Sequence, residues 1–139
     1  MTPASATVGT GASEFLELTD GGDLEIQRGF QGGCHVWGSV HAAGLYGGDV
    51  DHPRDANNPK VHFVLTDPSG ESLADTGDQR RALSVGSSGE LELLGEVVRL
   101  SNRGCDTLPG HAAILTVTVT DACETTVTDA RSVQLVPMM

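Results

Sequence analysis

The chain has 139 residues, a length typical of one domain, and its 8 basic and 19 acidic residues give a formal net charge of −11. Such an acidic surface repels phosphate groups, so we exclude nucleic acid as a partner. No apolar run approaches the roughly 20 residues of a membrane-spanning helix, so no membrane insertion is expected.

Residues 1–13 are small and polar, and they predict a flexible tail in front of a single domain over residues 14–139. The first six residues have neither a basic start nor an apolar core, so they are not an export signal. Such tails often follow the lipid-anchored cysteine of bacterial lipoproteins. By that analogy, a lipid anchor would lie upstream of this sequence.

Strand signals recur along the rest of the chain, and no helix is expected. Residues 23–28 and 60–66 alternate polar and apolar side chains, and residues 111–120 show the clearest alternation. Residues 90–100 are the most helix-like stretch, but Gly95 would interrupt a helix, so a strand is predicted there. Strands are expected at 14–18, 23–28, 34–42, 60–66, one or two within 71–86, and at 90–100, 111–120 and 127–136. About eight strands with frequent turns indicate an all-β sandwich.

Two segments carry a family resemblance. Residues 115–136 form a Thr/Val strand, an Asp-centred turn and a second Thr/Val strand. This segment resembles the last hairpin of bacterial immunoglobulin-like and PKD-like surface domains. Residues 31–41 resemble a stretch in uncharacterised bacterial envelope lipoproteins. The resemblance implies an immunoglobulin-like antiparallel β-sandwich that is secreted, periplasmic or on the outer cell surface of a bacterium, but a fold does not fix a function.

The cysteines number three, so at least one stays unpaired within the chain. Cys105 and Cys123 flank a strand that spans about 33 Å, whereas a disulfide needs Cα atoms within about 7 Å. The immunoglobulin-like template places Cys34 and Cys105 at the same end, and predicts that they pair. Cys34 would pair with Cys123 if it opened the following strand, and three reduced cysteines in a cytosolic protein remain a further alternative.

The loop over residues 47–58 is the most suggestive segment for metal chemistry. Its oxygen-bearing side chains have the spacing that hard cations prefer, and the template brings the turn after residue 120 to the same end. A calcium site is therefore one interpretation, whereas the other is a solvated loop whose Asp, Asn and Gly residues form turns. The candidate calcium ligands are Asp49, Asp51, Asp55, Asn57 and Asp121.

Scattered histidines suggest a second kind of metal site. His35 and His41 are six residues apart, about 20 Å along a strand, and cannot share an ion. A copper or zinc site would need histidines from different strands. The pairs that the template brings near each other are His41 with His62, and His35 with His111.

Strand 34–42 also carries the single tryptophan. Its more apolar face holds Val36 and Val40, which we assign to the core. Trp37 and His41 then face outward as candidate binding contacts, unless a loop covers the tryptophan.

No nucleophile elbow, phosphate loop or dinucleotide fingerprint occurs, so the chain is not expected to be an enzyme. We expect a non-catalytic binding or structural module that contacts a protein or a glycan through loops at one end of the sandwich. The alternatives are a metal-binding envelope protein and a small hydrolase, since Ser/His/Asp sites are recognised only by geometry. No cofactor is expected apart from calcium.

Overall fold

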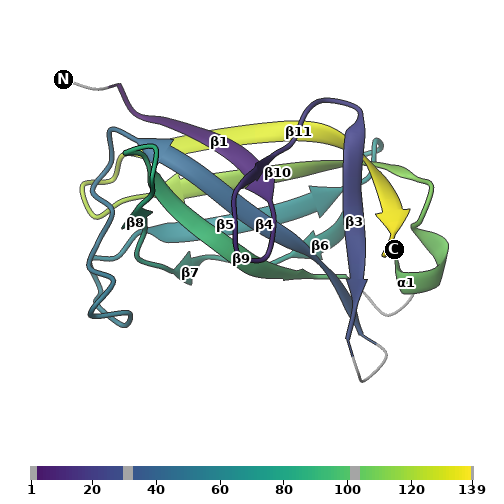
Figure 1. The fold of residues 1–139 in the computed structure, drawn as a ribbon, viewed down its shortest axis with the longest axis horizontal. Coiled ribbons are helices and arrows are strands. Elements are labelled where there is room, and N and C mark those ends of the chain that lie inside the picture. Colours follow the sequence, from purple (N-terminus) through teal and green to yellow (C-terminus); the bar gives the residue numbers. More distant parts are fainter. Residues whose placement is uncertain (1–2, 30–32, 101–103, 139) are drawn as a thin grey trace.

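A computed structural model describes residues 3–29, 33–100 and 104–138 (Figure 1). This part of the chain contains eleven strands and one four-residue helix. The elements are β1 (Ser5–Thr10), β2 (Leu16–Glu17), β3 (Gly22–Arg28), β4 (Cys34–Ala43), β5 (Lys60–Thr66), β6 (Ser72–Asp75), β7 (Gln79–Arg80), β8 (Ser84–Val85), β9 (Leu91–Arg99), α1 (Gly104–Thr107), β10 (Ala112–Thr120) and β11 (Thr126–Pro137).

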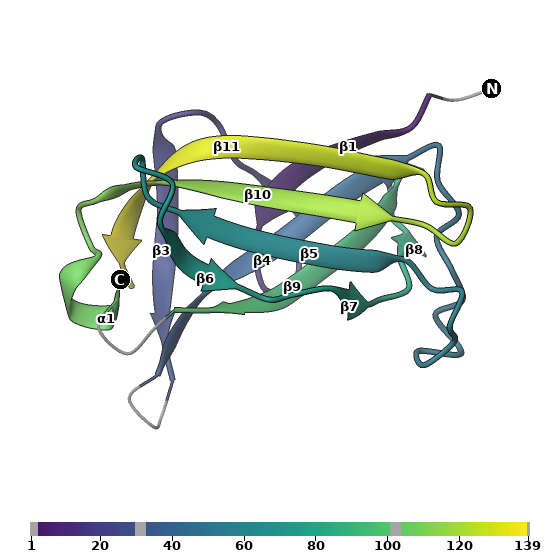
Figure 2. The ribbon, with the colours of Figure 1, turned by 180° about the vertical axis from the view of Figure 1, so that it is seen from behind.

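The strands form the two layers of a β-sandwich, which confirms the predicted all-β, immunoglobulin-like class. Sheet A contains β2, β1, β4, β9 and β8 in that order, and sheet B contains β11, β10 and β5, with β6 and β7 both pairing with β5. Sheet A lies in front in Figure 1, and sheet B lies in front in Figure 2, which views the molecule from the opposite side. The structure has more strands than the predicted eight, because β1 was not expected and residues 71–86 form three short strands.

Strand β3 belongs to both sheets. Its residues 22–26 pair with β11 in parallel, and its last residues, Gln27 and Arg28, pair antiparallel with His35 and Cys34 of β4. The pairing with β11 is the only parallel ladder among the described strands. The two layers are therefore joined along one side of the molecule by a single strand that crosses between them.

The core lies between the sheets and follows the predicted alternation. The inward-facing residues of β5 and β10 are almost completely buried, and so are Val36 and Val40 of β4, as the sequence predicted. Phe63 is the largest of the fully buried side chains. Its ring reaches across to Gly38 of sheet A, where an added Cβ would lie 2.8 Å from two ring carbons.

Residues 5–10 correct the prediction of a flexible tail over residues 1–13. They form β1, which pairs with β4 from Ser5 to Gly9 and buries Val8 completely. On the edge of β1 that faces away from β4, the backbone N–H of Val8 donates to the carboxylate of Asp129 in β11 at 2.8 Å. A short strand with a capped edge offers little unpaired backbone to other chains.

Both ends of the sandwich match the predicted topology. At one end, Cys34 at the start of β4 is disulfide-bonded to Cys105 in α1. At the other end, the N–H of Tyr46 donates to the Asp121 carboxylate at 2.9 Å, which joins the β4–β5 loop to the β10–β11 turn. The disulfide confirms the predicted pairing and fits an oxidising compartment.

The only helix in the described residues is α1, and it is too short to cross a membrane.

Candidate functional site: the Trp37 groove

A groove opens in sheet A between β1 and β3, which pair with different parts of the same edge of β4. Strand β9 pairs with β4 on one edge, from His35 to Ala42. The opposite edge is shared, because β1 pairs with residues 39–43 and β3 pairs with residues 34–35. No strand of the described chain pairs with residues 36–38 on that edge. β1 and β3 therefore diverge here and leave an opening beside Trp37.

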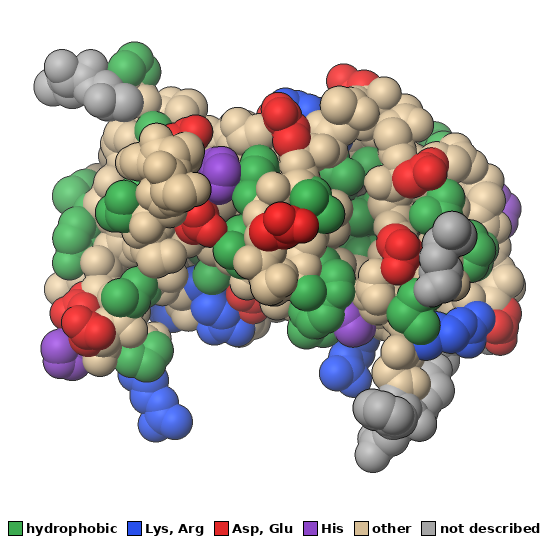
Figure 3. All heavy atoms as spheres, in the orientation of Figure 1, with side chains coloured by type: hydrophobic (Ala, Val, Ile, Leu, Met, Phe, Trp, Pro, Cys, Tyr) green, Lys and Arg blue, Asp and Glu red, His purple; other side chains and the backbone are tan. Residues whose placement is uncertain are grey.

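The opening forms a groove of about 630 Å³, a volume within the usual range for ligand sites. Figure 3 shows a hollow in this face of the molecule, between the β1–β2 segment and β3, with hydrophobic side chains inside it. We call it the Trp37 groove. Its lining residues are Thr10, Gly11 and Leu16 from the β1–β2 segment, Asp23, Glu25 and Gln27 from β3, Trp37 from β4, and Val136 and Pro137 from β11.

The two walls differ because of the alternation along β3. Leu24 and Ile26 point into the core. The residues that alternate with them along β3 therefore point outward and line the groove, namely Asp23, Glu25 and Gln27. The opposite wall is apolar at Leu16, whose surface is 48% exposed. The groove thus combines an aromatic side chain, exposed aliphatic surface and two carboxylates, and no Lys or Arg lines it.

Trp37 is held in place by its neighbours. Its backbone carbonyl accepts a hydrogen bond from the Thr10 hydroxyl at 2.6 Å, and its ring packs edge-on against His35 with centroids 4.4 Å apart. Partial burial, and then the nearby charge of Arg99, lower the pKa of His35 and favour its neutral form. The half-buried tryptophan is therefore supported by an uncharged ring on one side and tied to β1 on the other.

The β1–β2 loop, residues 11–15, forms the wall of the groove by crossing the outer face of sheet A. The buried Ser39 hydroxyl donates to the Gly11 carbonyl at 3.0 Å and accepts the N–H of Gly95 at 3.2 Å. Gly95 has φ +69°, and a Cβ there would lie 2.4 Å from the Ala12 carbonyl oxygen. Only glycine therefore allows β9 to lie so close to this loop.

His41, the other predicted binding contact, lies on the far side of this loop. Its ring stacks on Phe15 with centroids 3.7 Å apart, and its nitrogens are 4.0 Å from Glu90 and 3.9 Å from Glu92. It lines a separate groove of about 520 Å³. The β1–β2 loop thus separates Trp37 from His41, although both face outward from β4.

The predicted calcium ligands are used within their own turns. Asp49 accepts the N–H of Asp51 and pairs with His52, while Asp55 accepts the N–H of Asn57. The hydrogen bond from His52, and then that from Asp51, lower the pKa of the exposed Asp49.

Asp121 is largely buried and is already occupied by backbone donors. Its carboxylate accepts the N–H groups of Tyr46, Cys123 and Thr125. In the described residues no three His, Cys, Asp or Glu side chains lie close enough together to hold a metal ion. Calcium binding by the β4–β5 loop therefore stays a prediction for which the structure offers no preformed site.

Asn58, rather than a predicted ligand, organises the acidic loop. It is fully buried, its side-chain oxygen accepts the N–H of Asp49, and its amide donates to the His52 carbonyl. Sequence reasoning grouped the neighbouring Asn57 with the cation ligands. Nothing in the pattern distinguished the two, because only packing determines which amide is buried.

The predicted histidine pairs are not brought together as metal sites. His41 lies on the outer face of sheet A, whereas His62 lies on the outer face of sheet B, because the residues that flank each of them are buried. His35 packs against Trp37, while His111 is exposed just before β10.

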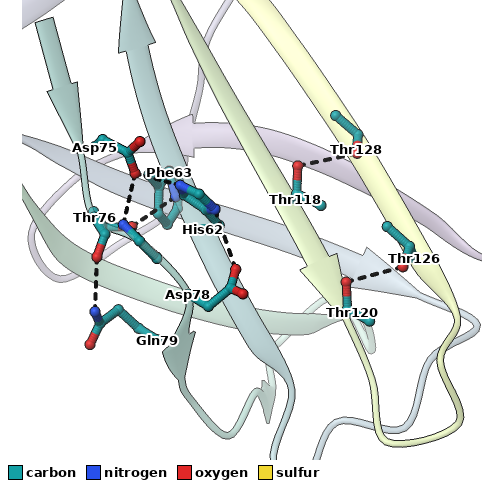
Figure 4. Close-up of polar contacts among 11 residues, drawn as sticks. His62, Phe63, Asp75, Thr76, Asp78, Gln79, Thr118, Thr120, Thr126 and Thr128 are labelled. Carbon is teal, nitrogen blue, oxygen red and sulfur yellow. Dashed lines mark hydrogen bonds and ion pairs between the residues drawn. The ribbon is translucent and has the colours of Figure 1, made fainter. Parts of the chain in front are cut away.

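His62 instead forms a polar cluster with two carboxylates (Figure 4). Its Nε2 lies 2.5 Å from Asp75, and its Nδ1 lies 3.3 Å from Asp78. Both ring nitrogens face carboxylates, so neither is available to activate a serine hydroxyl as a hydrolase triad requires. Threonine pairs join β10 and β11 on the same face, at Thr118 with Thr128 and at Thr120 with Thr126 (Figure 4).

This cluster predicts that the stability of the fold falls at acidic pH. The N–H of Gly77, and then His62, lower the pKa of Asp75 from its ordinary value of 3.8. Because the folded pKa is the lower one, the stabilisation is present above about pH 4 and is lost as the pH falls through the folded value. We expect the fall in melting temperature between about pH 5 and pH 2 to be smaller in Asp75→Asn than in the wild type. Identical falls, measured by circular dichroism, would contradict this.

No protein-family model matches this chain, and no curated protein matches it in sequence. Solved structures that are similar to it include CopC from Methylosinus trichosporium OB3b, with a TM-score of 0.40 at 10% identity over 87% of this chain and 88% of that chain. The N-terminal domain of PorA gives a TM-score of 0.33 at 16% identity, over 92% of this chain and 96% of that chain. Similarities this low do not bear on function, so the chain's own residues have to indicate it.

Proposed function

We propose that this protein is a non-catalytic binding module of the bacterial cell envelope or exterior, and that the Trp37 groove is its ligand site. The observation that carries the proposal is the opening beside Trp37, where β1 and β3 diverge along one edge of β4. A partly exposed tryptophan with carboxylates and an amide around it supplies both apolar contact and hydrogen bonding. Tryptophan is among the residue types that contribute most of the binding energy at protein surfaces.

The extracytoplasmic part of the proposal rests on covalent chemistry. The Cys34–Cys105 disulfide is buried, and both cysteines are less than 4% exposed. Disulfides of this kind persist in secreted and periplasmic proteins and are rare in the cytosol. The strongly acidic surface, with a net charge of −11, suits a soluble module that stays away from anionic lipid headgroups.

The proposal changes where the ligand is expected. From the sequence, the contact would involve loops at one end of the sandwich. In the structure, the β4–β5 loop at one end carries the exposed Tyr46. The structure offers a better-formed concave surface on the outer face of sheet A. Tyr46 is 49% exposed and lines neither the Trp37 groove nor the groove beside His41.

Peptide and glycan arrays, read with the labelled full chain, test this proposal. We expect Trp37→Ala to lose at least about ten-fold in affinity for whatever the wild type binds, since truncating a central aromatic contact commonly costs this much. Tyr46→Ala removes an exposed aromatic at the loop end and should leave binding unchanged. Trp37→Phe, which keeps a ring, should retain part of the binding if the fold is intact.

The opposite pattern would contradict the proposal. Binding that survives Trp37→Ala but disappears in Tyr46→Ala would place the ligand at the loop end. Melting temperatures of all three variants show whether each one is folded.

A further inference from the structure

We infer that the Trp37 groove binds an extended basic peptide, an Arg- or Lys-containing segment of a partner protein. The inference rests on the proposed function and specifies its ligand. Three observations support it: the uncompensated charge of the groove, the unpaired backbone edge beside it and the apolar surface that lines it.

The charge of the groove is entirely acidic. Asp23 and Glu25 line it, and in the described part of the chain no Lys or Arg forms an ion pair with either carboxylate. The nearest arginine along β3, Arg28, is directed to α1, where it pairs with Asp106 at 2.8 Å. Two carboxylates without a cationic partner, beside an aromatic ring, favour a guanidinium or ammonium group through ion pairing and cation–π contact.

The backbone of β3 offers a second complementary feature. Residues 22–26 pair with β11 on one edge only. The other edge turns toward β4 and meets it only at Gln27 and Arg28. The N–H and C=O groups of the preceding residues on this edge have no strand partner among the described residues. An extended peptide can pair with such an edge, whereas a neutral sugar has no matching row of amides.

The apolar part of the groove completes the match with a peptide. Leu16, Val136 and Pro137 surround Trp37 with aliphatic surface. The alkyl stems of Arg and Lys pack on such surface while their charged ends reach carboxylates. Asp23 and Glu25 are two residues apart on the outward face of β3, so they are spaced like alternate side chains of a bound extended peptide.

The fluorescence of the single tryptophan reports directly on this groove. The full chain is titrated at about 0.15 M salt, where the Debye length is only about 8 Å, so distant charges contribute little. The probes are acetylated and amidated tetra-arginine, its uncharged near-isostere tetra-citrulline, and the neutral sugar cellotetraose. We expect tetra-arginine to change the Trp37 emission saturably and at least about ten-fold more tightly than tetra-citrulline.

Two double variants with equal charge provide the matched control. Asp23→Asn with Glu25→Gln changes the net charge from −11 to −9. Asp51→Asn with Glu71→Gln makes the same change at exposed positions outside the groove. We expect the first variant to weaken tetra-arginine binding by about ten-fold and the second by less than about two-fold.

Each alternative result has a defined meaning. If both double variants weaken binding equally, or if tetra-arginine gives no saturable change, the inference of a basic peptide is overturned. If cellotetraose binds in a Trp37-dependent way and the peptides do not, the proposed function stands but its ligand is a glycan. If tetra-arginine binds without affecting the Trp37 emission, it binds elsewhere and the inference fails, whereas the proposed site fails only if the ligands found on the arrays also bind independently of Trp37.

Discussion

Replacing Cys34 and Cys105 together by alanine is expected to lower the free energy of unfolding by about 4 kcal/mol. The bridge joins residues 71 positions apart, so it removes much of the conformational freedom of the unfolded chain. It also ties α1 to the start of β4, where both sulfur-bearing side chains are buried in the core. In a domain of this size the loss corresponds to a fall in melting temperature of about 10 °C or more.

Thermal melts with and without reductant, together with intact mass, measure this effect. Cys123→Ser is the matched control, because Cys123 is exposed and unpaired, and its change should stay within about 0.5 kcal/mol. A reductant-independent melting temperature, with three free thiols by mass, would show that the disulfide is absent from the folded protein. The assignment to an oxidising compartment would then lose its main support.

Truncating Phe63 to alanine is expected to destabilise the fold by about 3–5 kcal/mol. The ring is fully buried and links the sheets, because it lies over Gly38 of the opposite layer. For the same reason Gly38→Ala should cost about 1–3 kcal/mol, since a Cβ there would lie 2.8 Å from the ring carbons. Gly33→Ala is the matched control, because no atom of the described residues outside its chain neighbours lies within 4 Å of its added Cβ.

Urea unfolding of these variants gives the free energies, and a double variant tests the contact itself. In Phe63→Leu the smaller side chain leaves room for the Cβ, so Gly38→Ala should cost less in that background than in the wild type. Equal costs in both backgrounds would mean that the ring and the glycine are not in contact. If Phe63→Ala left the free energy of unfolding unchanged, this would contradict the position of the core between the sheets.

Much of the fold was predictable because β-strand periodicity depends on local sequence. The alternation in residues 60–66 and 111–120 matches β5 and β10 almost residue for residue, with the apolar set buried. The inward positions of Val36 and Val40 followed from the same rule. The disulfide was predicted as well, because the immunoglobulin-like topology fixes which ends of the strands meet.

Strand β1 was missed because its sequence has little local signal. Residues 5–10 are small and polar, and only Val8 is a large apolar residue. What makes them a strand is tertiary: pairing with β4, burial of Val8 and the cap from Asp129. None of these can be read from the segment itself, since each partner is distant in sequence.

The candidate site could be predicted only in part. The outward position of Trp37 followed from the apolar character of the opposite face of β4. The groove could not be predicted, because its lining residues come from five strands spread along the sequence. It also depends on where β1 and β3 pair with the same edge of β4. The oxygen-rich loop was a more obvious sequence signal, but its side chains serve turns.

The most direct test of the Trp37 groove as the ligand site is to map a bound ligand by NMR. We expect tetra-arginine added to the isotope-labelled full chain to shift the Trp37 indole N–H and the amides of Gly11, Asp23 and Glu25, with little change outside the groove. Shifts concentrated instead in residues 49–58 and 121–125 would place the basic peptide at the acidic loop end and would contradict the Trp37 groove as its binding site.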